Sequence, residues 1–295
     1  MTGAILVLGG TGLLGRAVAA ELRRRLRPFE APGRAVFDLE DLGAVSSRLE
    51  SFRPSAVLNL AGFTDVAAAE RPEHHAAAIA LNAELPKALA RACARRTIPF
   101  VHVSTDYVFD GETTTPYLED DPVHPIQVYG VSKLEGEQGA LSINPRALIA
   151  RVSTLYGPDR AHRPAYVDAI LAQAREKAAA GGGALLVVER PVSSPTYAPD
   201  VAPALIDLLD NGAHGIVHVV NDGAASRLRL ASAAVSLAGL SKSVTVGARP
   251  EPHNTLARPS YSVLDTAKLH GMIGRKLPPW DNALARYVET FRGES

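Results

Sequence analysis

A glycine-rich turn directly after an apolar run near the start of the chain is the feature that most restricts the fold. The run Ala4–Leu8 is followed by Gly9-Gly-Thr-Gly-Leu-Leu-Gly15, with glycines at positions 9, 12 and 15. One glycine permits a tight turn from strand to helix, another lets the backbone approach a pyrophosphate, and the last lets the helix pack closely on the strand. The N-terminus of that helix offers unpaired N–H groups to phosphates. The turn therefore predicts a dinucleotide-binding fold.

Short apolar runs alternate with alanine-rich amphipathic segments through the first half of the chain. The runs have the character of buried parallel strands, and they are Ala4–Leu8, Ala56–Asn59, Phe100–Ser104 and Ala147–Arg151, with a weaker one near Pro28–Ala31. Helical patterns fill the gaps at Leu13–Leu26, Asp41–Phe52, His75–Arg95 and Tyr129–Leu141. This alternation predicts an α/β protein with a doubly wound, Rossmann-like parallel sheet and right-handed crossovers.

The character of the chain changes after Tyr156-Gly-Pro. A small-residue linker, Ala178–Gly183, is followed by expected strands at Leu185–Val188 and Ile216–Val219 and a helix at Leu228–Leu240. We expect a dinucleotide-binding domain over residues 1–155. Residues 156–295 are expected to form mainly a smaller substrate-binding lobe, with the later strands (about 185–220) returning to the main sheet. The segment Arg160–Arg163 is interpreted as a loop over the substrate pocket.

Composition excludes several classes of partner. The 31 basic and 31 acidic side chains give a formal net charge of +0, which argues against general affinity for nucleic acid or anionic membranes. No stretch of about 18 apolar residues suits a membrane span, and the apolar start lacks the basic leader of a signal peptide. The single cysteine, Cys93, excludes an intrachain disulfide, and the nine histidines show no metal-ligand spacing. We expect a cytoplasmic protein without a bound metal.

A tyrosine and a lysine four residues apart, Tyr129 and Lys133, occur in Tyr-Gly-Val-Ser-Lys. On a helix this spacing places both side chains on one face. An ammonium beside a phenol stabilises the phenolate and is expected to lower the pKa of Tyr129. Such a tyrosine can give a proton to a carbonyl oxygen while a hydride arrives at the carbon. Thr105 follows an expected strand, at the sheet edge where ligands bind in such folds.

Several motifs beside these residues resemble one protein family. Ser104-Thr-Asp-Tyr-Val-Phe-Asp-Gly111 is the most specific, and the others are Asn59–Thr64, Leu81–Glu84, Pro195–Tyr197, Ala257–Ser262 and Leu277–Trp280. Together they resemble the dTDP-4-dehydrorhamnose reductase family of the extended short-chain dehydrogenase/reductase superfamily, over essentially the whole chain. The resemblance implies NADPH or NADH as cofactor and reduction of the 4-keto group of a nucleotide-activated deoxyhexose. It also implies a monomer or homodimer.

The resemblance assigns roles to individual residues. It implies that Thr105 hydrogen-bonds the substrate carbonyl, that Tyr129 donates the proton, and that Lys133 holds the nicotinamide ribose. The cofactor-binding residues that it implies are Gly9, Thr11, Gly12, Leu13, Gly15, Asp38, Leu39, Ala61, Gly62, Tyr129 and Lys133. The substrate-binding candidates are Thr64, Val66, Thr105, Tyr107, Thr154 and Arg258. No metal ligand is implied.

The sequence departs from the family pattern in its substrate half. Thr154 stands where the family usually has tryptophan, and Val66-Ala67 replaces the usual Val-Asp. Glu189-Arg190 replaces an Asp-Gln pair, and Ser193 replaces a glycine. A threonine cannot stack on a sugar as an indole does. We therefore expect a nucleotide-sugar ketoreductase whose hexose need not be the rhamnose precursor.

The same residues bear on three other functions that are found among proteins with these motifs. Nucleotide-sugar dehydratases place a glutamate where this chain has Tyr107, so elimination lacks its base. A nucleotide-sugar epimerase also needs Thr105, Tyr129 and Lys133. A non-catalytic regulatory subunit of the methionine adenosyltransferase beta type shares the fold and signatures, and turnover distinguishes it from an enzyme. Glu30 lies where an acid favours NAD, but its basic neighbours leave NADH and NADPH both open.

Overall fold

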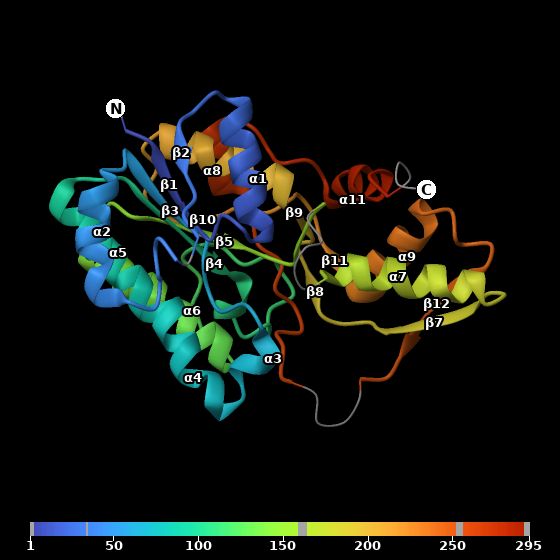
Figure 1. Ribbon diagram of the computed structural model, residues 1–295. Coiled ribbons are helices and arrows are strands. Elements are labelled where there is room, and N and C mark those ends of the chain that lie inside the picture. The colour runs from blue at the N-terminus through green and yellow to red at the C-terminus, as the bar shows by residue number, and fades with distance from the viewer. Residues whose placement is uncertain (1–2, 34, 159–163, 252–255, 292–295) are drawn as a thin grey trace.

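The computed structural model describes residues 3–33, 35–158, 164–251 and 256–291. Its centre is a six-stranded parallel sheet (Figure 1). In spatial order the strands are β10 (Gly215–His218), β5 (Leu148–Val152), β4 (Phe100–Thr105), β3 (Ala56–Asn59), β1 (Ile5–Leu8) and β2 (Phe29–Glu30). The chain reverses its direction of progress across the sheet between β1 and β3, which is the point where such folds bind ligands. The predicted doubly wound sheet is confirmed.

Helices cover both faces of this sheet (Figure 1). On one face lie α1 (Leu13–Arg24) and α8 (Ala198–Asp210), with α10 (Ala267–Ile273) beside α8. On the other lie α2 (Val45–Phe52), α5 (Leu85–Arg96) and α6 (Val128–Ile143). In α1 the buried residues form an apolar stripe that includes Leu14, Val18 and Leu22, whereas α6 buries small and polar residues, among them Lys133 and Glu137. The sheet strands are apolar on both sides because both faces are covered.

The segment expected as one helix over His75–Arg95 is interrupted. It forms α4 (Pro72–Ile79), a wide π-helical turn at Ala80–Glu84 called η2, and then α5. The short α3 (Val66–Ala69) precedes it, and short 3₁₀ turns lie at η1 (Leu42–Ala44) and η3 (Asp106–Val108). Such single wide turns recur at functional sites. The residues of the wide turn have the same helical character as their neighbours, so the sequence pattern did not separate the two helices.

A second, smaller lobe contains α7 (Tyr166–Ala179), β7 (Gly183–Val188), α9 (Arg227–Leu237), β12 (Val244–Arg249) and α11 (Trp280–Glu289). Figure 1 shows it to one side of the main sheet. β7 pairs in parallel with β12, apart from the main sheet, whereas β10 lies at the edge of the main sheet. Two later strands were expected to join the main sheet, and only β10 does so. β7 instead joins β12 because their shared apolar side packs on α7 and α9. The boundary at residue 155 stays a prediction.

Two further strand pairs connect the lobes. β6 (Leu155–Tyr156) pairs with β9 (Thr196–Tyr197), and β8 (Val192–Ser193) pairs with β11 (Ala225–Ser226). The segment around Tyr261 bridges β8 on its other side. These pairings bring residues that are far apart in the sequence to the carboxyl end of β4 and β5.

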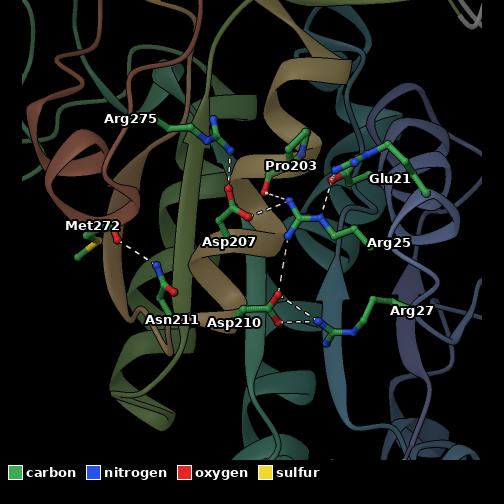
Figure 2. Close-up of polar contacts among 10 residues, drawn as sticks. Glu21, Arg25, Arg27, Pro203, Asp207, Asp210, Asn211, Met272 and Arg275 are labelled. Atoms are coloured by element: carbon green, nitrogen blue, oxygen red, sulfur yellow. Dashed lines mark hydrogen bonds and ion pairs between the residues drawn. The ribbon is translucent and has the colours of Figure 1, made fainter.

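Ion pairs join the end of α1 to α8, on the face of the sheet that these two helices cover (Figure 2). The Arg25 guanidinium bonds the carboxylates of Glu21 at 2.5 Å and Asp207 at 2.8 Å. Arg27 bonds Asp210 at 2.8 Å, and Arg275 from the segment after α10 also bonds Asp207. Asn211, at the end of α8, donates to the carbonyl of Met272 at 3.1 Å. The network therefore ties the end of α1 to elements that lie far from it in the sequence.

None of the helices in the described ranges is both long enough and apolar enough to cross a membrane. The expected loop at Arg160–Arg163 lies outside the described residues.

Candidate active site

The glycine turn joins β1 to α1 at the switch point of the sheet. Gly9 has a φ of 79°, a conformation that other residues adopt rarely, and it lies against the end of β3: an added Cβ would meet the Ala61 nitrogen at 2.7 Å. A Cβ on Gly15 would lie 2.1 Å from the Gly9 carbonyl oxygen. Gly12 caps α1 without a side chain, so the first N–H groups of the helix are not bonded by a side chain of that residue. This geometry suits a bound pyrophosphate.

The segment after β3 lies directly against the glycine turn. A Cβ on Gly62 would meet Asn82 Oδ1 at 2.8 Å and would lie 3.8 Å from Lys133 Nζ. A larger residue at position 62 would therefore displace the Asn82 side chain, and it would lie in contact with Lys133. Asn82, in the wide turn η2, holds this segment: its Oδ1 accepts from the Phe63 N–H at 2.8 Å, and its Nδ2 donates to the Phe63 carbonyl at 3.0 Å. The same Nδ2 donates to Ser132 Oγ at 3.0 Å, which connects the wall to α6.

The predicted proton donor and its neighbours converge at the carboxyl end of β4. Tyr129 lies in the first turn of α6, a helix that packs against β4 and the turn η3, and the Thr105 side chain acts to lower the pKa of its phenol. Tyr107 packs edge-on against the Tyr129 ring, with centroids 5.9 Å apart. Burial raises the pKa of Tyr129 above its ordinary value. This is the opposite of the lowering expected from the Tyr-Lys spacing, because removal of the phenol from water is the largest influence on it.

Lys133 lies one helical turn from Tyr129 but makes its contacts elsewhere. Its Nζ donates to the Val103 carbonyl at 2.6 Å and lies 3.4 Å from His102 Nε2. His102 Nδ1 in turn lies 3.1 Å from the side-chain amide of Asn59. Burial lowers the pKa of Lys133 to about 8, with Glu137 acting in the opposite direction. The lysine is therefore held at the strand β4, beside the Gly62 wall.

Asp106 follows Thr105 directly and is only 2% exposed. Its carboxylate accepts hydrogen bonds from the hydroxyls of Thr105 at 3.1 Å, Ser153 at 2.8 Å and Ser262 at 2.6 Å. Burial raises its pKa to about 6, which these hydrogen bonds oppose. The carboxylate connects β4, the end of β5 and the C-terminal segment at one point.

The remaining cofactor candidates lie on loops around the crevice. Asp38 and Leu39 are half-buried in the loop after β2; Asp38 Oδ1 accepts from the Glu40 N–H at 3.0 Å, and its carbonyl accepts from Arg48 at 2.5 Å. Glu30 ends β2 and is exposed. Thr11 and Leu13 belong to the glycine turn and the start of α1.

The substrate candidates are more widely spaced. Thr64 is exposed, and Val66 begins the short helix α3. Thr154 has a φ of 39°, which is strained for a β-branched residue, and its hydroxyl lies 2.8 Å from Ser193 Oγ. Both residues of that contact are departures from the family pattern. Arg258 is exposed, and its charge, with that of Arg227, favours the ionised form of Tyr107, although burial raises the pKa of Tyr107 overall.

Sequence reasoning missed three residues that shape this site: Asn82, His102 and Asp106. Asn82 and Asp106 lie within motifs that carried the family resemblance, but the motifs alone gave them no role. No sequence pattern joins His102 to Lys133, because the contact depends on the register of β4 against α6. The residues present fit a nicotinamide dinucleotide, since the glycine turn and Gly62 follow β1 and β3 at the switch point of the sheet, and Thr105 ends the neighbouring strand β4.

Comparison with known proteins gives a consistent result. Residues 2–292 match the family model described as the RmlD substrate binding domain. The chain is 37% identical to a protein of Streptomyces antibioticus named as a probable dTDP-4,6-dihydroxy-2-methyloxan-3-one 4-ketoreductase, with 95% of this chain and 92% of that protein aligned. It is 35% identical to the dTDP-4-dehydrorhamnose reductase of Mycobacterium tuberculosis, over 95% of this chain and 91% of the relative.

A solved structure agrees with these relatives. The fold matches a dTDP-4-dehydrorhamnose reductase from Bacillus anthracis in complex with NADP, with a TM-score of 0.89 and 26% sequence identity. The match covers 98% of this chain and 100% of the other.

Proposed function

Because the chain belongs to the dTDP-4-dehydrorhamnose reductase family, we propose that it reduces the 4-keto group of a nucleotide-activated 6-deoxyhexose. NADPH or NADH, when bound, supplies the hydride for this reaction. The observation that carries the proposal is the packing of the first turn of α6, which holds Tyr129, against the end of β4 at Thr105, next to the glycine turn at the switch point of the sheet. A proton donor beside a dinucleotide crevice is what carbonyl reduction requires.

The residues of the chain divide the work of the reaction. Tyr129 gives its phenolic proton to the alkoxide that forms as the ketone is reduced. Thr105, at the end of β4, is proposed to hydrogen-bond the carbonyl oxygen of the substrate. Lys133, held beside Gly62, is placed to bond the nicotinamide ribose and to lend positive charge near the tyrosine. Thr105 and Lys133 are buried and Tyr129 is half-buried, which limits access of bulk water and strengthens each of these interactions.

The glycine turn from Gly9 to Gly15 and the wall at Ala61 and Gly62 are proposed to bind the pyrophosphate and nicotinamide ends of the cofactor. Asp38 and Leu39 are proposed to lie near its adenine. Tyr107, Thr64, Val66, Thr154 and Arg258 are proposed to meet the nucleotide sugar. The strained Thr154 in place of tryptophan suits a hexose other than the rhamnose precursor, because the pocket loses an aromatic face.

We further propose a cytoplasmic monomer or homodimer with a cofactor domain over residues 1–155, to which β10 and α8 are added, and a substrate lobe formed mainly by the rest of residues 156–295. The balanced net charge of +0 supports a small-molecule partner rather than nucleic acid.

The test is a panel of dTDP-activated 4-keto-6-deoxyhexoses, including dTDP-4-dehydrorhamnose, each supplied with NADPH and with NADH. Consumption of the reduced nicotinamide, with an equal yield of the 4-hydroxy sugar, is expected for at least one pair. Cofactor binding without turnover across the whole panel would contradict the proposal and favour a regulatory binding protein. Exchange of stereochemistry without net oxidation of the cofactor would instead indicate an epimerase.

A further inference from the structure

The helix that carries the proposed proton donor begins without a cap of its own. Gln127 is the N-cap residue of α6, with extended backbone angles (φ −148°, ψ 159°), and its side chain makes no capping hydrogen bond. Both polar atoms of its side-chain amide are buried and have no hydrogen-bond partner among the described residues. The first N–H groups of a helix have no partner within the helix, and burying them unpaired is costly. A partner from elsewhere in the chain is therefore needed at the start of α6.

That partner is Glu70, which lies 58 residues before Val128 in the sequence. Its Oε1 accepts a hydrogen bond from the Val128 N–H at 2.7 Å, directly before Tyr129 in the first turn of the helix. Glu70 is half-buried, and no ion pair joins its carboxylate to a cation in the described ranges. A carboxylate at this place also faces the positive end of the helix dipole. The bond is thus a helix cap that a distant segment supplies.

The capping residue belongs to the segment that is proposed to meet the nucleotide sugar. Glu70 is the C-cap residue of α3, and the substrate candidates Thr64 and Val66 precede it. At the start of the segment, the backbone of Phe63 is bonded to Asn82, whose side chain also bonds the second turn of α6. Both ends of this segment are therefore attached to the same helix, one at its first turn and one at its second.

We propose that Glu70 is a positioning residue for the reduction: its cap on α6 fixes the distance between the phenol of Tyr129 and the segment that contacts the sugar. This inference rests on the proposed ketoreductase function. Proton transfer requires the donor to lie within hydrogen-bond reach of the oxygen that receives the proton, and a displacement of about 1 Å can cost about 10²-fold in rate. Glu70 acts on the reaction only through the N–H of Val128.

Three variants separate this role from a general effect on stability. Glu70→Ala removes the cap, and Glu70→Gln keeps an amide oxygen that accepts from the same N–H. Asn144→Ala is the matched control, because it removes a side-chain hydrogen bond at the other end of α6, where Asn144 Oδ1 accepts from the Arg146 N–H at 3.2 Å. For each variant, kcat and the KM values for the sugar and for the reduced nicotinamide are measured with a sugar that the unaltered enzyme reduces.

We expect Glu70→Ala to lower kcat by about 10-fold or more and to raise the KM for the sugar, since the phenol and the sugar-binding segment lose their fixed spacing. The KM for the reduced nicotinamide should stay within about 2-fold, because the glycine turn is untouched. Glu70→Gln should keep kcat within about 3-fold of the unaltered enzyme, since it loses only the charge at the helix terminus. Asn144→Ala should keep it fully. Unchanged kcat in Glu70→Ala would overturn the proposal, as would an equal loss in Asn144→Ala or in Glu70→Gln.

A second measurement needs no turnover. Hydrogen exchange of the Val128 amide is followed by NMR in ¹⁵N-labelled protein, for the unaltered chain and the same three variants. The Val128 N–H should exchange about 10-fold faster or more in Glu70→Ala, because its acceptor is removed. It should stay protected in Glu70→Gln and in Asn144→Ala. Unchanged protection in Glu70→Ala would overturn the proposal.

The two measurements separate this inference from the proposed function. If no sugar in the panel is reduced but exchange at Val128 responds as expected, the proposed reaction is wrong and the cap from Glu70 stands. If reduction occurs and exchange responds, but Glu70→Ala leaves kcat unchanged, the reductase stands and the positioning role is wrong.

Discussion

The Nζ of Lys133 donates to the carbonyl of Val103 across 2.6 Å, which ties the helix of the proposed proton donor to the strand that ends at Thr105. An ammonium has three hydrogens to donate. One is bonded to Val103, and the nitrogen lies 3.4 Å from His102 Nε2. The partly satisfied, buried charge is consistent with the proposed role of Lys133 in binding ribose hydroxyls.

Lys133→Met should weaken binding of the reduced cofactor by about 10-fold or more, since a charge-assisted hydrogen bond is lost. It should also lower kcat. The midpoint of thermal unfolding should not fall, because burial opposes the charge of Lys133 in the folded state. Cofactor affinity from fluorescence titration, together with thermal melting, checks both statements. Lys87→Met, which removes a surface ion pair with Glu84, is the control. An unchanged affinity in Lys133→Met would contradict the ribose role.

Asn82→Ala should destabilise the protein by about 2 to 4 kcal/mol, because the half-buried N–H and C=O groups of Phe63 and the buried Ser132 hydroxyl lose their partner. It should also raise the KM for the cofactor, since the Gly62 wall is no longer held. Urea unfolding and steady-state kinetics measure the two effects. Asn211→Ala removes one exposed bond to Met272 and should cost less than about 1 kcal/mol. A similar loss of unfolding free energy in the two variants would show that Asn82 does not hold the segment at Gly62 and Phe63 in place.

Arg25→Ala should cost about 2 kcal/mol near neutral pH, because it leaves the buried Glu21 and half-buried Asp207 with fewer partners (Figure 2). Arg27→Ala, which loses only the exposed Asp210, should cost less than about 1 kcal/mol. Hydrogen bonds and charge from Arg24 and Arg25 lower the pKa of Glu21 from 4.5 to about 2. The ionised Glu21 therefore stabilises the fold above pH 4.5, and this contribution is lost as the pH falls toward 2.

The free energy of unfolding at acid pH should also differ between Arg25→Ala and the unaltered protein. The decline in unfolding free energy between those pH values should be shallower in Arg25→Ala than in the unaltered protein, because part of the stabilisation of ionised Glu21 is already gone. Parallel curves for the two proteins would show that Arg25 contributes nothing to the Glu21 carboxylate.

The extent to which the sequence predicts this structure depends on the range of the interactions. The glycine turn, the strand β3 at Ala56–Asn59 and the helix that carries Tyr129 all follow from local pattern, and each lies within two residues of its expected bounds. The prediction that β7 joins the main sheet is wrong, because an apolar run does not specify which sheet a strand joins. Its partner β12 is encoded about 60 residues later, and nothing in either strand marks the pairing.

In the site too, local pattern predicts which residues come together, whereas contacts between distant segments were not predicted. Tyr129 and Thr105 are near one another as their positions predict, but the direction of the pKa change at Tyr129 was predicted wrongly. Spacing on a helix places Lys133 on the correct face, yet it says nothing of the Val103 carbonyl that accepts its hydrogen bond. Asp106 and Ser262 are 156 residues apart, so their contact could not be found without the fold.

Asp106 should also give the protein a distinct response to pH. Burial raises its pKa from 3.8 to about 6, so the folded state binds this proton more tightly than the unfolded chain. Its contribution to stability is therefore greatest below pH 3.8 and falls as the pH rises through 6, by roughly 3 kcal/mol. Asp106→Asn cannot titrate there. Urea unfolding across this window should show the difference in unfolding free energy between the two proteins changing by about that amount; a constant difference would contradict the buried carboxylate.

The most direct test of the proposed reaction is turnover by Tyr129→Phe, followed by the absorbance of the reduced nicotinamide with a 4-keto sugar that the unaltered enzyme accepts. Tyr156→Phe is the matched control, since its buried hydroxyl has no hydrogen-bond partner among the described residues. We predict that Tyr129→Phe lowers kcat by about 10²- to 10⁴-fold with cofactor affinity nearly unchanged, because only the transferable proton is removed. Tyr156→Phe should retain normal turnover. Near-normal turnover by Tyr129→Phe would contradict the assignment of Tyr129 as the proton donor.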